Sequence, residues 1–159
     1  MITKKKIILD WNPPAEVHFK FNVDGSVLGK PEPAGAGGVL RDFNGKILCL
    51  FSCHLGCLVS NAAEIWVIKV ALGLCISNVN LRGRAISIVN DSKVAVSWVI
   101  NGDFGSLAHF NIISEIHSNL KILGDVEVIF ESRAYNSYVG SLAKMGSNCA
   151  GDFVEWGDV

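Results

Sequence analysis

The sequence predicts one α/β domain whose centre is a five-stranded mixed sheet with helices on both faces. Two observations support this prediction. Three apolar segments with strand character open the chain, and two single strands follow among segments with helical periodicity. The resulting order, βββαβααβα, is typical of an antiparallel meander extended by right-handed crossovers that add parallel strands. At 159 residues, 50% of them hydrophobic, the chain can bury one sizeable core.

The first three strands are expected to be antiparallel neighbours. Residues 17–25 alternate apolar and polar side chains, which is the period of two of a half-buried strand. Residues 37–43 and 46–53 flank the dipeptide Asn44-Gly45, which tolerates the positive φ of a tight hairpin turn. These two segments are therefore predicted to pair through that turn.

The rest of the domain is expected to combine helices with two parallel strands. Ser60 can cap a helix that runs to about Ser77 and is apolar around most of its circumference, so this helix should pack on the sheet. The later elements are predicted at residues 85–90 (strand four), 92–100 (helix), 107–123 (helix), 125–130 (strand five) and 137–145 (helix).

The domain is predicted to span residues 17–148, with an N-terminal arm at residues 1–16 and a tail without a core pattern at residues 149–159. No apolar stretch reaches the about 18 residues that span a bilayer, and the start of the chain lacks a secretory signal. Five cysteines, an odd number, indicate reduced thiols. We therefore expect a soluble, intracellular protein with no membrane partner, in the nucleus or the cytoplasm.

Composition and spacing disfavour three other kinds of site. The formal net charge of −1 provides no large positive field, so any nucleic-acid binding should be modest and salt-sensitive. The glycine-rich residues 35–38 are predicted as a loop and the start of a strand, because no Lys-Ser/Thr pair follows to complete a phosphate loop. Cys49, Cys53 and Cys57 lack the paired spacing of a zinc site.

Three carboxylates are placed by their elements to meet at one point. Asp24 closes strand one, Asp91 ends strand four, and Glu64 lies in the first turns of the first helix. Strands one and four are expected to be neighbours, and ligands of α/β sheets sit beyond the carboxyl ends of such strands. Glu64 is out of place in an apolar helix start unless a cation neutralises it. The set predicts a divalent-metal site, and its oxygen ligands suit Mg²⁺ or Mn²⁺.

Five motifs surround these carboxylates: Phe21-Asn22-Val23-Asp24-Gly25-Ser26, Gly35-Ala36-Gly37-Gly38-Val39-Leu40-Arg41-Asp42, Ala63-Glu64-Ile65-Trp66, Asn90-Asp91-Ser92-Lys93 and Ser141-Leu142-Ala143-Lys144-Met145-Gly146. The segment Trp11-Asn12-Pro13-Pro14 precedes the first of them. In order and spacing the motifs resemble the ribonuclease H family, and most of all its plant reverse-transcriptase-associated, retroelement-type branch.

The resemblance implies a ribonuclease H-like fold, an activity and a substrate. Proteins of this family cut the RNA strand of RNA–DNA hybrids by two-metal hydrolysis, in which one ion activates the attacking water and the other stabilises the leaving oxygen. The three carboxylates would be both metal ligands and catalytic residues. Nucleic-acid contacts are expected at Gly25, Ser26, Asn61 and Arg133. Two simpler roles stay open, a surface position for Arg133 and a helix-start role for Asn61.

Two residues depart from the family pattern. Counting back from Leu142-Ala143-Lys144, the fourth carboxylate of the family falls on Gly140, and a histidine found in many active members is replaced by Phe130. These departures place the second ion and proton delivery or product release in doubt. Ser137, Ser141 or Glu131 could hold a metal-bound water instead.

Two classes of function therefore remain open. The first is a metal-dependent endoribonuclease acting on RNA–DNA hybrids, weakened by Gly140 and Phe130. The second is a catalytically inactive module of retroelement origin that binds nucleic acid or a protein partner, or serves as a structural domain of a larger polypeptide. Three carboxylates favour the first class, and the two departures favour the second.

Overall fold

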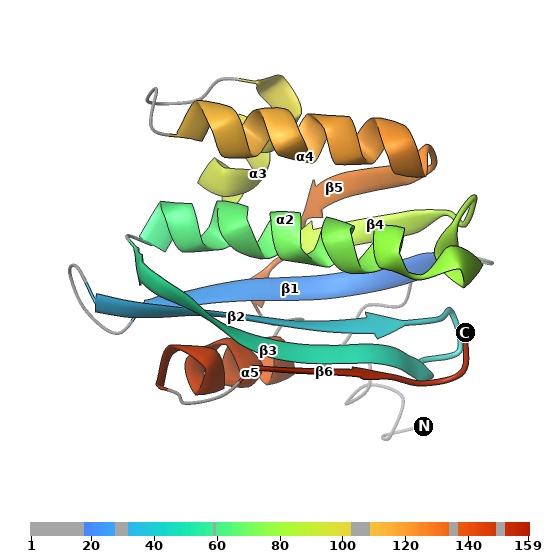
Figure 1. Ribbon diagram of the computed structural model, residues 1–159, viewed down its shortest axis with the longest axis horizontal. Coiled ribbons are helices and arrows are strands. Elements are labelled where there is room, and N and C mark those ends of the chain that lie inside the picture. Colours follow the sequence, from blue (N-terminus) through green and yellow to red (C-terminus); the bar gives the residue numbers. More distant parts are fainter. Residues whose placement is uncertain (1–17, 28–31, 59, 103–108, 134–136, 149–151) are drawn as a thin grey trace.

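The computed structural model describes residues 18–27, 32–58, 60–102, 109–133, 137–148 and 152–159. Its strands form one sheet in the order β5-β4-β1-β2-β3-β6, which Figure 1 shows from top to bottom. The strands are β1 (Phe19–Val27), β2 (Glu32–Arg41), β3 (Ile47–Leu58), β4 (Ile86–Asn90), β5 (Val126–Phe130) and β6 (Phe153–Trp156). β1, β2 and β3 are antiparallel neighbours, whereas β4 and β5 continue the sheet parallel to β1. The predicted mixed sheet is confirmed, with one strand more than expected.

Helices cover both faces of the sheet, as predicted. They are α2 (Ser60–Ser77), α3 (Lys93–Asn101), α4 (Phe110–Leu123) and α5 (Ser137–Asn148), with a short 3-10 helix at Val79–Leu81. Successive residues of a strand point to opposite faces. Leu40 of β2 therefore joins the main core beneath α2, α3 and α4, while its neighbour Val39 packs against Val139 and Leu142 of α5.

The glycine-rich segment lies inside β2 and not in a loop, which corrects the sequence prediction. A Cβ on Gly35 would lie 2.1 Å from the carbonyl oxygen of Ala143, and one on Gly37 would lie 2.5 Å from the Ala143 nitrogen. Glycine is therefore required because the backbone of α5 rests directly on β2. On the same helix, Gly140 faces Asp24 of β1.

The β2–β3 hairpin has a longer turn than predicted. The N–H of Asp42 donates to the carbonyl of Lys46, and the N–H of Gly45 donates to the carbonyl of Asp42, each at 3.0 Å. The loop therefore has three residues, with Gly45 at a φ of 87°. The Asp42 carboxylate accepts the N–H groups of Asn44 and Lys46, both at 2.9 Å, and this local bonding stabilises the longer form.

The sixth strand lies in the segment predicted as a tail. Residues Phe153–Trp156 pair antiparallel with Cys49–Ser52 of β3. The pairing continues past the strand, because the N–H of Gly157 donates to the carbonyl of Leu48 at 2.8 Å. Four residues are too few to show a strand period in the sequence. The predicted arm at residues 1–16 lies outside the described residues, and no helix in the described part of the chain is long and apolar enough to cross a membrane.

Candidate metal centre

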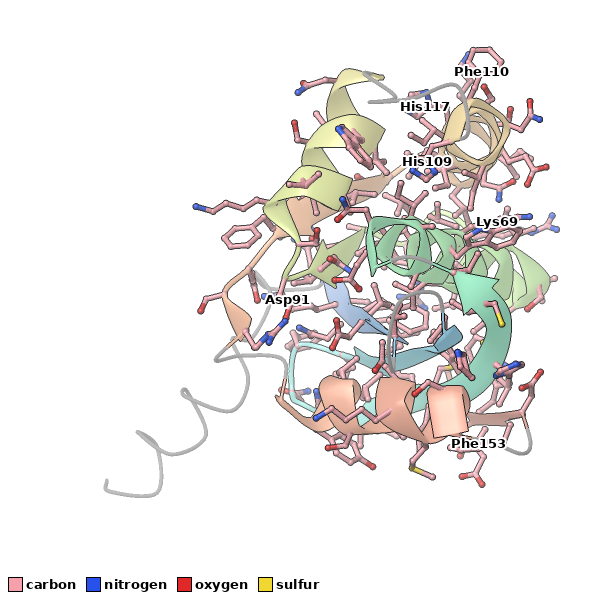
Figure 2. The ribbon with its side chains drawn as sticks, turned by 90° about the vertical axis from the view of Figure 1, so that its left-hand side faces the viewer. Lys69, Asp91, His109, Phe110, His117 and Phe153 are labelled. Atoms are coloured by element: carbon pink, nitrogen blue, oxygen red, sulfur yellow. The ribbon has the colours of Figure 1, made fainter. Side chains whose placement is uncertain are left out.

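Asp24, Glu64 and Asp91 meet at the carboxyl end of β4. One carboxylate oxygen from each lies within 4.8 Å of the others. Among the described residues, these three form the one group of acidic, histidine or cysteine side chains that are close enough together to hold a metal ion. The three residues come from β1, α2 and the turn after β4, so the site depends on the packing of the whole domain. Figure 2 shows Asp91 below α3 and above α5 in that view.

The sequence analysis predicted Asp24 at the end of strand one. In the structure Asp24 lies inside that strand. β1 continues to Val27, and Asp24 is paired with Gly37 of β2. The parallel pairing of β1 with β4, however, stops at Asn22 and Val89. Asp24 therefore sits just beyond the last parallel pair, which is where α/β sheets bind their ligands.

Glu64 is only 8% exposed and is held from two sides. Its Oε1 accepts a short hydrogen bond from the N–H of Gly25, the residue after Asp24. The same oxygen lies 3.5 Å from Nδ2 of Asn90, the residue before Asp91. A Cβ on Gly25 would lie 2.8 Å from this oxygen and 2.7 Å from the backbone of Ala63, so glycine is needed for α2 to approach β1.

Asp91 is paired with Arg133. The Arg133 Nε donates to Asp91 Oδ2 at 3.1 Å, and the Asp91 side chain is 3% exposed while that of Arg133 is 86% exposed. The hydrogen bond and the charge of Asp91 raise the pKa of Arg133. A solvent-facing guanidinium thus stands at the rim of the site, where sequence reasoning expected a phosphate contact.

Burial raises the pKa of two carboxyl groups of this site, those of Asp24 and Glu64. It raises the pKa of Asp24 to about 7, and the charge of Asp91 adds to the shift. Burial, followed by the charge of Asp24, raises the pKa of Glu64 to about 9. Both shifts have the cause expected when acidic groups share a desolvated pocket without a compensating cation.

This donor set fits a divalent metal ion. The converging ligands are all carboxylate oxygens, which Mg²⁺, Mn²⁺ and Ca²⁺ prefer over nitrogen or sulfur. A bound cation would also reverse the electrostatic cost that raises the pKa of Asp24 and Glu64. The site can therefore hold a divalent metal through these three side chains.

The remaining predicted residues lie at different distances from this centre. Ser26 is half-buried in β1, two residues after Asp24, and Asn61 is exposed in the first turn of α2. Glu131, suggested as a holder of water, instead pairs with the buried Lys20 at 2.5 Å. Ser141 is exposed on α5, and the side chain of Ser137 lies outside the described part.

The two departures from the family pattern lie beside the carboxylates. A Cβ added to Gly140 of α5 would lie 3.2 Å from Asp24 Oδ2, so residue 140 does face the cluster. Phe130 ends β5, next to Asn90 of β4, and is 39% exposed. The Lys93 amine lies 5.1 Å from the centre of its ring. This cation–π contact was not anticipated.

Sequence reasoning also missed Asn90, which is fully buried beside Glu64. Its side chain contacts Val23, Glu64 and Ser92. The signal was a polar residue that follows two apolar ones and directly precedes Asp91.

Comparison with known proteins identifies the group to which the domain belongs. The family model described as reverse transcriptase-like matches residues 22–146, which include the three carboxylates and Gly140. The chain belongs to this family. The Arabidopsis thaliana protein named "Putative ribonuclease H protein" is 28% identical over 144 residues, covering 89% of this chain and 23% of the relative. The chain thus spans about a quarter of that relative's length.

Solved structures show that this reverse transcriptase-like domain has the ribonuclease H fold. A ribonuclease H1 isolated from compost matches with a TM-score of 0.76 and 21% identity, over 83% of this chain and 96% of that one. Ribonuclease H1 of the archaeon Halobacterium salinarum has a TM-score of 0.73 and 22% identity, over 81% and 96%. The protease-reverse transcriptase of prototype foamy virus has a TM-score of 0.69 and 20% identity, over 89% and 22%. The predicted resemblance is confirmed.

Proposed function

We propose that this domain is a metal-dependent endonuclease that hydrolyses the RNA strand of RNA–DNA hybrids. The observation that carries the proposal is the convergence of Asp24, Glu64 and Asp91 within 4.8 Å in a reverse transcriptase-like domain. A structural neighbour, the compost ribonuclease H1, has been solved in complex with an RNA/DNA hybrid. Its 22% identity supports a common fold, so the hybrid is part of the proposal for this chain.

The chain's own residues would hold the ions and orient the substrate. Bound Mg²⁺ or Mn²⁺ would supply positive charge for the phosphate in the transition state and lower the pKa of water. Asp24, Glu64 and Asp91 are the ligands, and the N–H of Gly25 fixes one oxygen of Glu64. Arg133 would move from Asp91 to a phosphate oxygen, because its guanidinium is exposed and Asp91 would then be neutralised by the metal.

The substrate would contact solvent-accessible residues of β1 and α2 that lie close in sequence to the carboxylates. Ser26 on β1 and Asn61 on α2 each lie within three residues of a ligand carboxylate, and both reach solvent. Short polar side chains and backbone groups suit the shallow minor groove of a hybrid, where 2′-hydroxyls distinguish RNA from DNA. Together with Gly25 and Arg133, they form the proposed contact set.

Gly140 and Phe130 support a second candidate, an inactive module that still binds nucleic acid or a protein. Gly140 faces Asp24 but has no ligand to offer, and Phe130 cannot transfer a proton. In this case metal binding or catalysis would be lost while the fold and the rim of the site remain.

One incubation separates the candidates. The protein is mixed with an RNA–DNA hybrid labelled on the RNA strand, with Mg²⁺, with Mn²⁺ or with chelator, and Asp24→Asn is the matched control. Ion-dependent cleavage by the native chain and none by Asp24→Asn supports the nuclease. Equal products from both proteins would point to a contaminant, and no cleavage with retained hybrid binding would select the inactive module.

A further inference from the structure

Asn90 links all three segments that carry the proposed ligands. It is fully buried at the carboxyl end of β4. Its Oδ1 accepts the N–H of Ser92 at 2.7 Å, just after Asp91. Its Nδ2 donates to the carbonyl oxygen of Val23 at 3.3 Å, just before Asp24, and points to Glu64 Oε1 at 3.5 Å.

The orientation of this amide follows from its partners. The Ser92 N–H can only donate, so it must face the amide oxygen, and the Val23 carbonyl can only accept, so it must face the amide nitrogen. The second hydrogen on Nδ2 is then directed at Glu64. Glu64 Oε1 thereby has two donors, the Asn90 amide and the Gly25 N–H.

We propose that Asn90 is a positioning residue for the metal centre: it fixes the Glu64 carboxylate and sets the spacing of the segments that bear Asp24 and Asp91. The inference rests on the proposed role of the three carboxylates as metal ligands. Partners of this kind orient the ligands of a metal, and replacing them typically lowers metal affinity about 10–100-fold.

A purely structural role makes a different prediction. Any buried polar residue that loses its hydrogen bonds destabilises the fold, because the groups left behind are desolvated and unpaired. Ser87 on the same strand is a matched case, since it is 9% exposed and its hydroxyl donates to Glu127 at 3.0 Å, one hydrogen bond that does not involve the three carboxylates. If Asn90 only stabilised the fold, substitutions of Asn90 would leave metal affinity unchanged, as substitutions of Ser87 should.

The test is Mn²⁺ binding by isothermal titration calorimetry, together with the melting temperature without metal. Asn90→Leu keeps the branched shape of the side chain, with a larger volume, and removes every side-chain hydrogen bond. Asn90→Thr retains one hydroxyl, which can accept from Ser92 and donate to either Val23 or Glu64 but not to both. Ser87→Ala is the control for the loss of a buried hydrogen bond on β4.

We expect Asn90→Leu to weaken Mn²⁺ binding about 10–100-fold, and Asn90→Thr to lie between it and the native protein. Ser87→Ala should melt lower and bind Mn²⁺ like the native protein. Native affinity in both Asn90 variants would overturn the inference, and if Asn90→Leu does not fold, native affinity in Asn90→Thr alone would do so. If the native chain binds no Mn²⁺, the metal centre and this inference fail together, whereas binding without hybrid cleavage rejects only the nuclease.

Discussion

Gly140 leaves room for a fourth carboxylate opposite Asp24. Gly140→Asp should lower the Mn²⁺ concentration needed for half-maximal thermal stabilisation by about tenfold and increase hybrid cleavage, because one more anionic ligand adds roughly 1–2 kcal/mol of attraction for a cation. The new Cβ would lie 3.2 Å from Asp24 Oδ2, so the Asp24 carboxylate must shift slightly. The measurement is single-turnover cleavage and melting temperature across a metal titration.

Gly140→Asn is the control for this prediction, since it has the same shape without the charge. It should show neither the increase in rate nor the gain in metal affinity. Phe130→His, added to Gly140→Asp, should increase turnover further if a proton carrier is missing from β5. Overlapping metal titrations for native protein, Gly140→Asp and Gly140→Asn would mean that residue 140 does not act on the metal.

Asp24 and Glu64 should make the metal-free domain less stable as pH rises. Their pKa values in the folded chain, about 7 and about 9, are above the ordinary values of carboxyl groups, so the folded state binds protons more tightly than the unfolded state. The stabilisation is complete at pH values below about 4 and is lost as pH passes these raised values. Without metal, the melting temperature of native protein should fall between pH 5 and 9 relative to that of Asp24→Asn, and Mn²⁺ should reverse the fall. Parallel curves for the two proteins would contradict the raised pKa of Asp24.

The convergence of the three carboxylates could be predicted from the sequence, because Asp91 directly follows a strand and Glu64 is an acidic residue in an apolar helix start. Asp24, Glu64 and Asp91 each interrupt an apolar pattern. The contacts that orient them could not be read, since the pairs Asn90 with Glu64 and Arg133 with Asp91 join residues 26 and 42 positions apart. Such pairs depend on how elements pack, which a local pattern does not contain.

The contact between α5 and β2 controls the distance from Gly140 to the carboxylates. Gly37→Ala should destabilise the domain by about 1–3 kcal/mol, because the new methyl group would lie 2.5 Å from the backbone of α5. Gly73→Ala is the matched control: Gly73 is exposed in α2, and its Cβ would meet nothing within 4 Å. That change should stabilise by about 1 kcal/mol through helix propensity. Urea denaturation of both variants measures the difference, and equal signs would refute the backbone contact.

The sequence predicted the order and most boundaries of the elements, and its errors share a cause. β2 begins at Glu32 although its glycines have low strand propensity, because packing against α5 outweighs that propensity. The β2–β3 turn is one residue longer because of the Asp42 carboxylate. β6 was missed because its pairing with β3, about 100 residues earlier, and not its own pattern, makes it a strand.

At the scale of the molecule, binding of a hybrid should depend on few charges. The net charge of −1 gives the chain no overall excess of positive charge, and Arg133 pairs with Asp91 at the site. In the Asp24→Asn background, which should prevent cleavage, hybrid should bind more tightly than duplex DNA of the same sequence, and Arg133→Ala should reduce the slope of log affinity against log salt by about 1. Arg82→Ala, exposed before the amino end of β4, should leave the slope unchanged. Equal affinity for both duplexes would favour the protein-binding module.

The pairing of β6 with β3 also has a consequence while the chain is being synthesised. Until Phe153–Trp156 has left the ribosome, the outer edge of β3 at Cys49–Ser52 presents unpaired N–H and C=O groups. A nascent or truncated chain lacking these residues would therefore offer an open, apolar strand to other chains. β6 covers this edge, and the new edge of the sheet is a short strand that carries Glu155. A stop codon before Phe153 should therefore favour aggregation, even though such a chain would still contain the three carboxylates and all four of the described α-helices.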